Sequence, residues 1–172
     1  MVENEKSLMI EGLDNGRVAL LSAIRTVSDN LATRRPAVDK WSILECVEHV
    51  AVAEEYLLAQ ILAATHYGTP VINKQREAAI QVRGLDRTRR IESPDVAKPT
   101  GRFATLESAA EHFLSCRTNT IEFLESCNDD LRAMLTDHPT IGRVNCYEML
   151  LLMALHPQRH ANQIGEIRAA LK

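Results

Sequence analysis

Aromatic residues are scarce in this sequence of 172 residues, at 4% of the total, although hydrophobic residues as a whole make up 45%. The core must therefore be built from Leu, Ile, Val, Ala and Met, and that bias favours helices over sheets. Long hydrophobic runs are lacking too. The longest covers only the seven residues Met149 to Leu155, whereas a membrane-spanning helix needs about 20. The composition predicts a helical globular protein without a transmembrane segment.

The sequence also lacks an excess of positive charge. Twenty Lys and Arg residues stand against 23 Asp and Glu residues, which gives a net charge of −3. A chain with this balance exerts no long-range attraction on a polyanion, so nucleic acid is not an expected partner. The N-terminal residues, VENEKSLMIEG, begin with acidic side chains and contain no apolar stretch of the signal-peptide type. These features predict a cytoplasmic protein.

No Cys-X-X-Cys pair occurs among the four cysteines, and no secretory signal supports a disulfide framework. We expect the thiols to be reduced and to pack as small hydrophobic side chains. A catalytic thiol is the alternative interpretation. The four residues are Cys46, Cys116, Cys127 and Cys146.

Apolar residues at helical spacing, together with helix start signals, predict four long helices. Ser42 and Glu45 have the spacing of a capping box, and Asn145 and Glu148 repeat that spacing near the C-terminus. In such a box each side chain bonds the backbone N–H of the other residue, so both pairs mark helix N-termini. The predicted helices cover residues 5–33, 42–65, 105–127 and 145–171.

The long segment between the second and third helices cannot be one regular helix, because it contains six Gly and Pro residues. A short helix at Asn73–Ile80 fits its pattern. A connection of this length implies that the chain crosses the domain instead of turning back at once. We therefore predict an all-α fold, a four-helix bundle with a long crossover between helices two and three, in a single domain covering residues 1–172.

Three histidines are candidates for a metal site. His156 and His160 lie one turn apart in the apolar stripe of the fourth helix, so both rings point at the core. This i, i+4 spacing lets one helix offer two nitrogens to a single ion. His49 lies at the edge of the apolar stripe of the second helix, beside the small residues Cys46 and Ala53. The alternative is that each ring is structural and makes one hydrogen bond.

Further polar side chains converge on the same region, where a bundle core should be apolar. Tyr56 and Gln60 follow His49 along the second helix, and Gln163 lies beside the histidine pair of the fourth. Burying these groups is unfavourable unless a partner such as a metal satisfies them, so we take the three as pocket candidates. The remaining histidines, His66, His112 and His138, are expected at the surface. The fourth helix lacks the Glu that follows the first His in a zinc protease helix.

Three segments resemble the DinB-like family of damage-inducible bacterial proteins. They are W-S-I-L-E-C-V-E-H at Trp41–His49, P-T-G-R-F-A-T-L-E-S at Pro99–Ser108 with Arg117 downstream, and H-P-T-I-G-R-V-N-C-Y-E through H-P-Q-R-H-A-N-Q-I at His138–Ile164. The resemblance implies an up-down-down-up four-helix bundle, often dimeric, with a metal held by three histidines of helices two and four. Carried over residue by residue, the implied ligands are His49, His156 and His160.

The resemblance also implies an activity. The better-understood relatives in this family are metal-dependent thiol transferases that use low-molecular-weight thiols such as bacillithiol or mycothiol. The resemblance therefore predicts a small-molecule substrate and a homodimer. One divalent ion, zinc or nickel, is expected, although imidazole also suits iron and copper. Two alternatives stay open: a metal-dependent hydrolase, because the same ion can activate water, and a non-catalytic, metal-binding stress protein.

Two residues bear on the geometry of this site. Pro157 separates the two histidines of the fourth helix, where it removes an N–H and crowds the carbonyl of Met153, so a kink is expected there. Arg117 falls on the inner face of the third helix. It is a further pocket candidate, because a buried guanidinium suits a carboxylate-bearing thiol. A structural ion pair with Glu45 is the alternative.

The crossover carries a group of arginines. They could bind nucleic acid, but the segment has no interleaved aromatic residues and the chain is net negative. We expect them to be solvated loop residues. The group consists of Arg83, Arg87, Arg89, Arg90 and Arg102.

Overall fold

The computed structural model describes residues 3–64, 66–70, 72–89 and 91–172, and its fold is mostly helical. The four long helices are α1 (Glu3–Ile24), α3 (Ile43–Leu62), α5 (Leu106–Ser126) and α6 (Cys146–Ala170). The shorter elements are α2 (Asp29–Thr33), α4 (Lys74–Leu85), the 3-10 helix η1 (Asp95–Ala97) and the strands β1 (His66–Tyr67), β2 (Met134–His138) and β3 (Gly142–Asn145). In the described part of the chain, no helix is long and apolar enough to cross a membrane.

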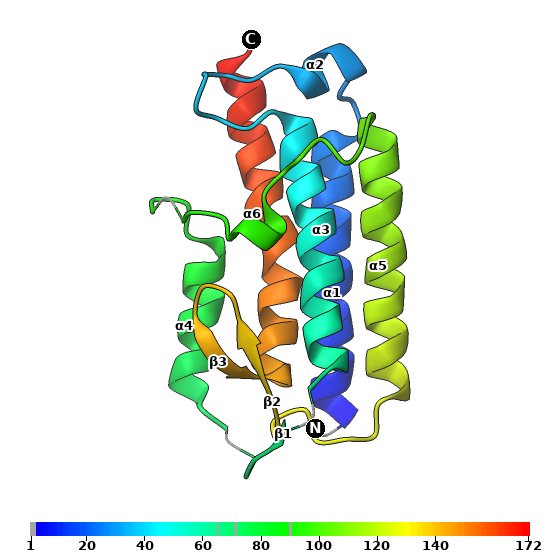
Figure 1. Ribbon diagram of the computed structural model, residues 1–172, viewed down its shortest axis with the longest axis vertical. Coiled ribbons are helices and arrows are strands. Elements are labelled where there is room, and N and C mark those ends of the chain that lie inside the picture. The colour runs from blue at the N-terminus through cyan, green and yellow to red at the C-terminus, as the bar shows by residue number, and fades with distance from the viewer. Residues whose placement is uncertain (1–2, 65, 71, 90) are drawn as a thin grey trace.

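The four long helices form a bundle in which α1 and α6 run one way and α3 and α5 run the other way (Figure 1). This is the up-down-down-up order, so the predicted four-helix bundle is confirmed. Because α3 and α5 are parallel, the chain between them has to travel back along the whole bundle. It does so through α4, which lies beside α6, and then passes over α3 at η1 (Figure 1).

Both predicted capping boxes are present. The Ser42 hydroxyl accepts a hydrogen bond of 3.2 Å from the backbone N–H of Glu45, whose carboxylate accepts one of 2.7 Å from the N–H of Ser42. Asn145 and Glu148 make the same reciprocal pair at the start of α6. These bonds satisfy N–H groups that a helix N-terminus leaves without intrahelical acceptors. They determine where the two histidine-bearing helices begin.

The first and second helices end earlier than predicted. Helix α1 stops at Ile24 instead of residue 33, and Ser28 then caps the short α2 by accepting a hydrogen bond of 3.4 Å from the N–H of Leu31. Thr26 and Val27 are β-branched and Ser28 competes for backbone hydrogen bonds, which together favour a break. Helix α3 ends at Leu62, and the predicted end at Thr65 lies outside the described residues.

A small three-stranded antiparallel sheet was not predicted from the sequence. Strands β2 and β3 form a hairpin between α5 and α6, and β1 pairs with the free edge of β2. Gly142 adopts a φ of +72° at the hairpin, a conformation that glycine adopts without steric cost. The strands have two to five residues, too few for an alternating pattern to be distinctive.

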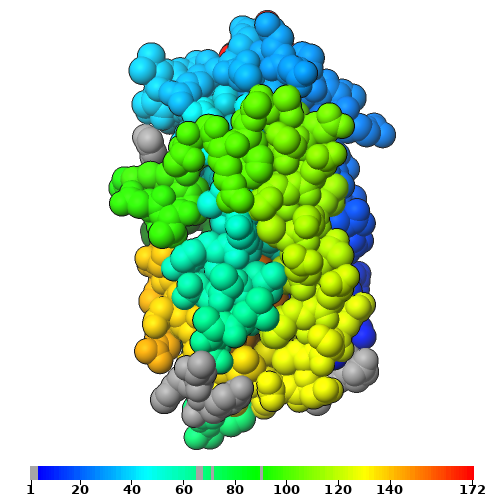
Figure 2. Space-filling model, turned by 45° about the vertical axis from the view of Figure 1, so that its right-hand side comes forward, coloured from blue at the N-terminus to red at the C-terminus, as the bar shows by residue number. Residues whose placement is uncertain are grey.

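The end of the crossover is fastened to α3 by a buried carboxylate. The Glu48 side chain is 1% exposed and accepts hydrogen bonds from the backbone N–H groups of Thr100, at 2.7 Å, and Arg102, at 3.0 Å. The space-filling view shows this segment, in green, lying across α3, in cyan (Figure 2). The helix predicted at Asn73–Ile80 is also present, as α4, and extends to Leu85 with Asn73 as its N-cap.

Helix α1 packs directly against the backbone of α6. A Cβ atom placed on Gly16 would lie 2.5 Å from the carbonyl oxygen of Ala154 and 3.6 Å from Pro157. The bundle therefore requires glycine at position 16. This contact brings α1 against the stretch of α6 that carries the first of its two core histidines.

Candidate metal centre

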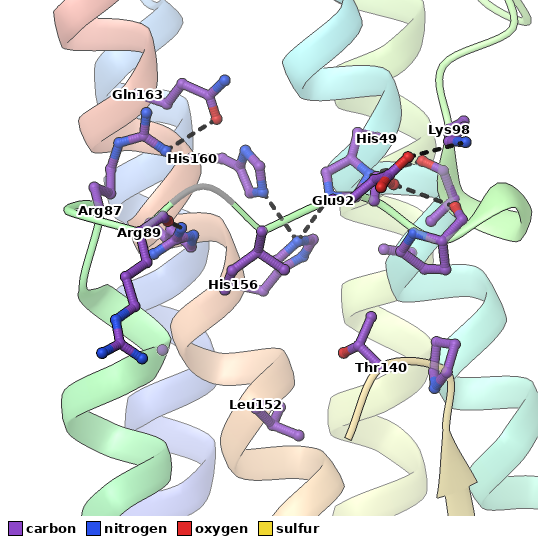
Figure 3. Close-up of a pocket in the computed structure, with 18 of the residues that line it drawn as sticks. His49, Arg87, Arg89, Glu92, Lys98, Thr140, Leu152, His156, His160 and Gln163 are labelled. Carbon is purple, nitrogen blue, oxygen red and sulfur yellow. Dashed lines mark hydrogen bonds and ion pairs between the residues drawn. The ribbon is translucent and has the colours of Figure 1, made fainter. Parts of the chain in front are cut away.

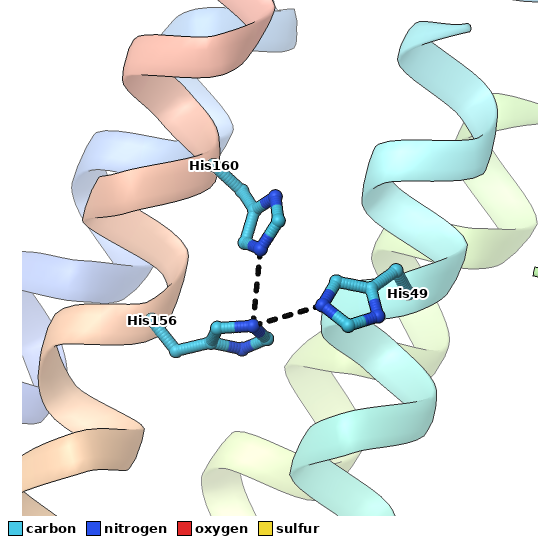
Figure 4. Close-up of side chains that lie close together, drawn as sticks. All are labelled: His49, His156 and His160. Carbon is cyan, nitrogen blue, oxygen red and sulfur yellow. Dashed lines mark hydrogen bonds between the residues drawn. The ribbon is translucent and has the colours of Figure 1, made fainter. Parts of the chain in front are cut away.

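Three imidazoles meet between α3 and α6 (Figure 4). His156 Nε2 lies 3.0 Å from His49 Nε2 and 3.0 Å from His160 Nε2. One nitrogen of each ring lies within 4.8 Å of the other two, and no other group of three potential His, Cys, Asp or Glu ligands is found among the described residues. The structure thus brings together the three histidines that the sequence singles out.

The ring of His49 is oriented by the crossover. Its Nδ1 lies 2.6 Å from the carbonyl oxygen of Ala97 in η1. Because a carbonyl oxygen can only accept, Nδ1 must carry the proton and donate it. The Nε2 atom therefore keeps its lone pair and directs it toward the other two rings, which is the tautomer that a metal ligand needs.

Hydrogen bonds alone cannot satisfy this cluster well. His49 Nε2 can only accept, and a single hydrogen on His156 Nε2 cannot point at both neighbouring rings at once. His160 Nδ1 is buried and has no hydrogen-bond partner within the described chain. A cation between the rings would accept these lone pairs, because His156 Nε2 lies 3.0 Å from each of the other two nitrogens and an ion about 2.0–2.1 Å from a nitrogen fits between atoms that far apart. The donor set fits a divalent metal ion.

Burial keeps the three rings neutral. It lowers the pKa of His49, although the bond to Ala97 partly opposes that shift. Burial, followed by repulsion from the neighbouring imidazoles, holds the pKa values of His156 and His160 well below the usual histidine range. A neutral imidazole has a free lone pair, so at pH 7 all three nitrogens are available as ligands.

Pro157, which lies between the two histidines of α6 in the sequence, does not prevent their rings from converging. The helix runs from Cys146 to Ala170 with Pro157 inside it, and the Nε2 atoms of His156 and His160 lie 3.0 Å apart. Any bend that the proline introduces therefore leaves both rings aimed at the same point.

The three histidines line a cleft of about 1220 Å³. Its walls come from α3, α4 and α6, from the segment before α3, from residues 87–89 and 91–99 of the crossover, and from the hairpin turn at residues 138–141. The close-up shows Arg87 and Gln163 on one side of the rings, and Glu92 and Lys98 on the side of His49 (Figure 3). All three imidazoles line this cleft, so a small molecule entering it would reach their common point.

Two of the predicted pocket residues line the cleft and two do not. Tyr56 and Gln163 belong to its lining. Gln60 does not, which corrects the prediction: the hairpin covers its end of α3, where Thr136 donates a hydrogen bond of 3.2 Å to the Gln60 carbonyl. A sequence that gives no clear sign of the hairpin could not reveal this.

Arg117 is also not a pocket residue. Its side chain is fully buried and pairs with Glu54 of α3, with Nη2 at 2.9 Å from Oε2 and Nε at 2.8 Å from Oε1. The alternative prediction, a structural ion pair, is therefore correct, but the partner of Arg117 is Glu54 and not Glu45. Glu45 pairs instead with Arg35. Glu54 lies deeper in the bundle than Glu45, and only there can the two charges compensate each other away from solvent.

Trp41 is a cleft residue that the sequence analysis missed. Its ring centroid lies 4.9 Å from that of His49 and 6.4 Å from that of His160, to which it is nearly parallel. In the sequence it stands out only as the first residue of the segment Trp41–His49. Trp41 precedes Glu45 by four residues and His49 by eight, a spacing that puts residues on the same side of a helix. This spacing is the signal that could have placed Trp41 beside His49.

The other histidines differ in position. His112 is partly exposed and lies 2.9 Å from Glu55, away from the cleft. His138 corrects the prediction of a surface residue: it is partly buried, lines the cleft, and has its pKa lowered by that burial. The side chain of His66 lies outside the described part of the structure.

Comparisons with known proteins agree with this fold. A family model described as the DinB superfamily matches residues 13–164. The uncharacterized protein YuaE of Bacillus subtilis (strain 168) is 18% identical over 159 residues, which are 92% of this chain and 96% of YuaE. Among solved structures, YfiT from Bacillus subtilis matches with a TM-score of 0.63 at 15% identity, covering 99% of this chain and 90% of that chain. YfiT is described as a probable metal-dependent hydrolase with an unusual four-helix bundle topology.

Proposed function

This chain belongs to the DinB superfamily, and we propose that it is a metal-dependent enzyme in which His49, His156 and His160 hold one divalent ion, zinc or nickel. The observation that carries the proposal is the convergence of three neutral imidazoles on one point of an open cleft. Three protein ligands leave a coordination position for a substrate, as in catalytic sites, whereas structural zinc sites are closed by four.

Each residue of the site would have its own role. The three imidazoles hold the ion, and the carbonyl of Ala97 keeps the His49 ring in the correct tautomer and orientation. Trp41 covers one side of His49 and His160 with an apolar ring. A bound divalent ion supplies Lewis acidity, which deprotonates a thiol or lowers the pKa of a water molecule toward about 7.

We favour transfer of a small thiol to an electrophile as the reaction. The cleft has a volume of about 1220 Å³, which exceeds the 300–1,000 Å³ or so of a typical site for one small ligand. Such a cleft has room for a thiol and an electrophile side by side, as a two-substrate transfer requires. The resemblance of the sequence to thiol-using DinB-like proteins points to the same class of nucleophile.

Hydrolysis is the second candidate, and the description of YfiT as a probable metal-dependent hydrolase favours it. The same three ligands could hold an ion that activates water instead of a thiol. A protein that only sequesters the ion, as part of a stress response, would need the histidines but not the cleft.

Metal content tests the site itself. The protein should be purified without a His tag or chelators, and the bound elements measured for the wild type and for His49→Ala and His160→Ala. We expect close to one equivalent of zinc or nickel in the wild type and a loss of at least about tenfold in affinity in each variant. His112→Ala, which changes a histidine outside the cleft, should retain the ion. Equal metal content in all four proteins would rule out this site.

Turnover then separates the candidate reactions. The metal-loaded protein should be incubated with a panel of thiols and electrophiles, and separately with simple esters and amides. Metal-dependent consumption of a thiol supports the transferase, and hydrolysis without added thiol supports the hydrolase. A protein that binds the ion but performs neither reaction is a metal-binding protein.

A further inference from the structure

The cleft has the opposite charge balance to the chain as a whole. The chain carries a net charge of −3, yet eight Lys and Arg residues line the cleft against three Asp and Glu residues. A cleft walled by protein focuses the field of such charges on a molecule inside it. The excess of positive charge in the lining therefore favours a negatively charged molecule in the cleft.

Four of the basic residues form one wall, which we call the arginine wall: Arg83, Arg87, Arg89 and Arg159. Arg83 lies in the last turn of α4, Arg87 and Arg89 follow that helix, and Arg159 lies on α6. Figure 3 shows Arg87 and Arg89 on the same side of the three imidazoles. The three acidic residues of the lining, Asp39, Glu45 and Glu92, come from other segments.

Two members of the arginine wall hold it in place. Arg159 is 9% exposed and donates hydrogen bonds to the backbone carbonyls of Asp86 and, at 3.2 Å, Arg89. Arg87 makes a double ion pair with Glu166 of α6, at 2.7 and 2.6 Å, and donates to Gln163 at 3.2 Å. These contacts tie the segment after α4 to the helix that carries His156 and His160.

The other two members are available to a ligand. Arg83 and Arg89 are exposed at the cleft, and neither has an ion pair or side-chain hydrogen bond with any part of the chain that the structure describes. A guanidinium presents a planar set of donors that suits carboxylate and phosphate oxygens. Glu166 makes an ion pair with this wall, and the Asp86 carboxylate interacts electrostatically with Arg89 and Arg159. Two negative charges against four positive ones leave the wall positive.

We propose that the arginine wall binds an oxyanion, the carboxylate or phosphate group of a small substrate whose reactive end reaches the three histidines. That the reactive end of the substrate reaches the histidines depends on the proposed function, whereas the binding of an anion by the arginine wall does not. This assignment moves the role of anion recognition from Arg117, which is sealed in the core, to arginines that the sequence analysis treated as solvated. Arg90 lies outside the described residues, and Arg102 pairs with Glu55 instead.

Calorimetric titration of the zinc-loaded full chain tests the anion site directly. The probes are succinate, inorganic phosphate and succinamide, the last being a neutral analogue of succinate. We expect one of the two anions to bind with a dissociation constant that rises with salt, because these charges are partly solvated. The tighter anion identifies the group. The proposal is overturned if neither anion binds, or if succinamide binds as well as succinate.

Matched variants locate the anion. Arg83→Gln combined with Arg89→Gln should weaken binding about tenfold or more, since a charged hydrogen bond contributes about that factor. Arg25→Gln combined with Arg34→Gln removes the same charge from exposed positions outside the cleft and should leave binding unchanged. Equal effects of the two double variants would overturn the proposal, as would a single-stranded oligonucleotide that binds more tightly than either small anion and depends on the arginine wall.

The same variants connect the anion site to the reaction. For a carboxylate-bearing thiol such as 3-mercaptopropionate, the arginine-wall variant should raise KM about tenfold, whereas KM for neutral 2-mercaptoethanol should not change. The calorimetric titration is also repeated on His160→Ala. Anion binding that survives there would show that the anion site does not need the ion. Anion binding by a zinc-loaded wild type that consumes no thiol would uphold the anion site while the proposed function fails.

Discussion

Arg117 Nη2 donates a hydrogen bond of 2.9 Å to the carbonyl oxygen of Met153. That carbonyl is the acceptor that residue 157 would normally use, and Pro157 has no N–H to donate. The arginine of α5 therefore satisfies the group that the proline of α6 leaves open. The same guanidinium donates to the carbonyl of Leu13 in α1, at 2.6 Å, and to Glu54 in α3. One side chain thus joins all four long helices directly beside His156.

Replacing Arg117 with methionine should therefore be costly. The substitution leaves the buried Glu54 carboxylate without its counter-charge and the Met153 carbonyl without a donor, so we expect a loss of about 3–5 kcal/mol in the free energy of unfolding. Urea denaturation measures it. Arg143→Met removes an ion pair whose side chains are more than half exposed and should cost less than about 1 kcal/mol. Similar losses in both variants would contradict this role for Arg117.

Two glycines of α1 should respond to alanine in opposite ways. At Gly16 the added methyl group would lie 2.5 Å from the backbone oxygen of Ala154. Helix α1 would have to move, which we expect to destabilise the protein by about 1–3 kcal/mol. At Gly12 the nearest atom, Ala154 Cβ, is at 3.6 Å, so alanine should stabilise the helix by about 0.5–1 kcal/mol. Thermal unfolding of both variants checks the signs, and a stabilising Gly16→Ala would refute the close contact.

Removal of the ion should lower the stability of the wild-type protein. A ligand that binds only the folded state at 100 times its dissociation constant stabilises it by about 2.7 kcal/mol. Excess EDTA should therefore lower the Tm of the zinc-loaded protein by several degrees, and added zinc should restore it. His160→Ala should show the same Tm with and without EDTA. A wild-type Tm that does not respond would count against a bound ion.

The buried cysteines should be unreactive over the physiological range. Burial raises the pKa of Cys46 and of Cys146 to about 12 and that of Cys116 to about 11. Because the thiolate is the nucleophile, these groups should react slowly with Ellman's reagent at pH 7 to 9 and accelerate only at higher pH. Only the partly exposed Cys127 should react fast in the native protein.

The variant Cys127→Ser serves as the control for this labelling. Its native form should show no fast phase, and unfolding in guanidinium should release the three remaining thiols. A fast phase that persists in Cys127→Ser would identify a reactive thiol among the buried three and revive the interpretation of a catalytic cysteine.

Much of the fold and of the candidate site could be predicted because the relevant signals are local. The capping boxes at Ser42 and Asn145 lie within four residues of chain, and so does the spacing of His156 and His160. The break in the first helix could not be predicted with the same certainty. Its apolar spacing continues through Val27 and Leu31, and a competing turn at Ser28 is stabilised by contacts that the pattern does not contain.

The chain's own sequence determined the helices, their start points and the inward face of the three histidines, because helical periodicity and capping depend on neighbours a few residues away. Only the tertiary structure decided which distant groups meet. It paired Arg117 with Glu54 and Met153, oriented His49 through Ala97, and set Arg83 and Arg89 at the cleft. Those contacts join segments that are tens of residues apart, and packing of the whole bundle is what selects them.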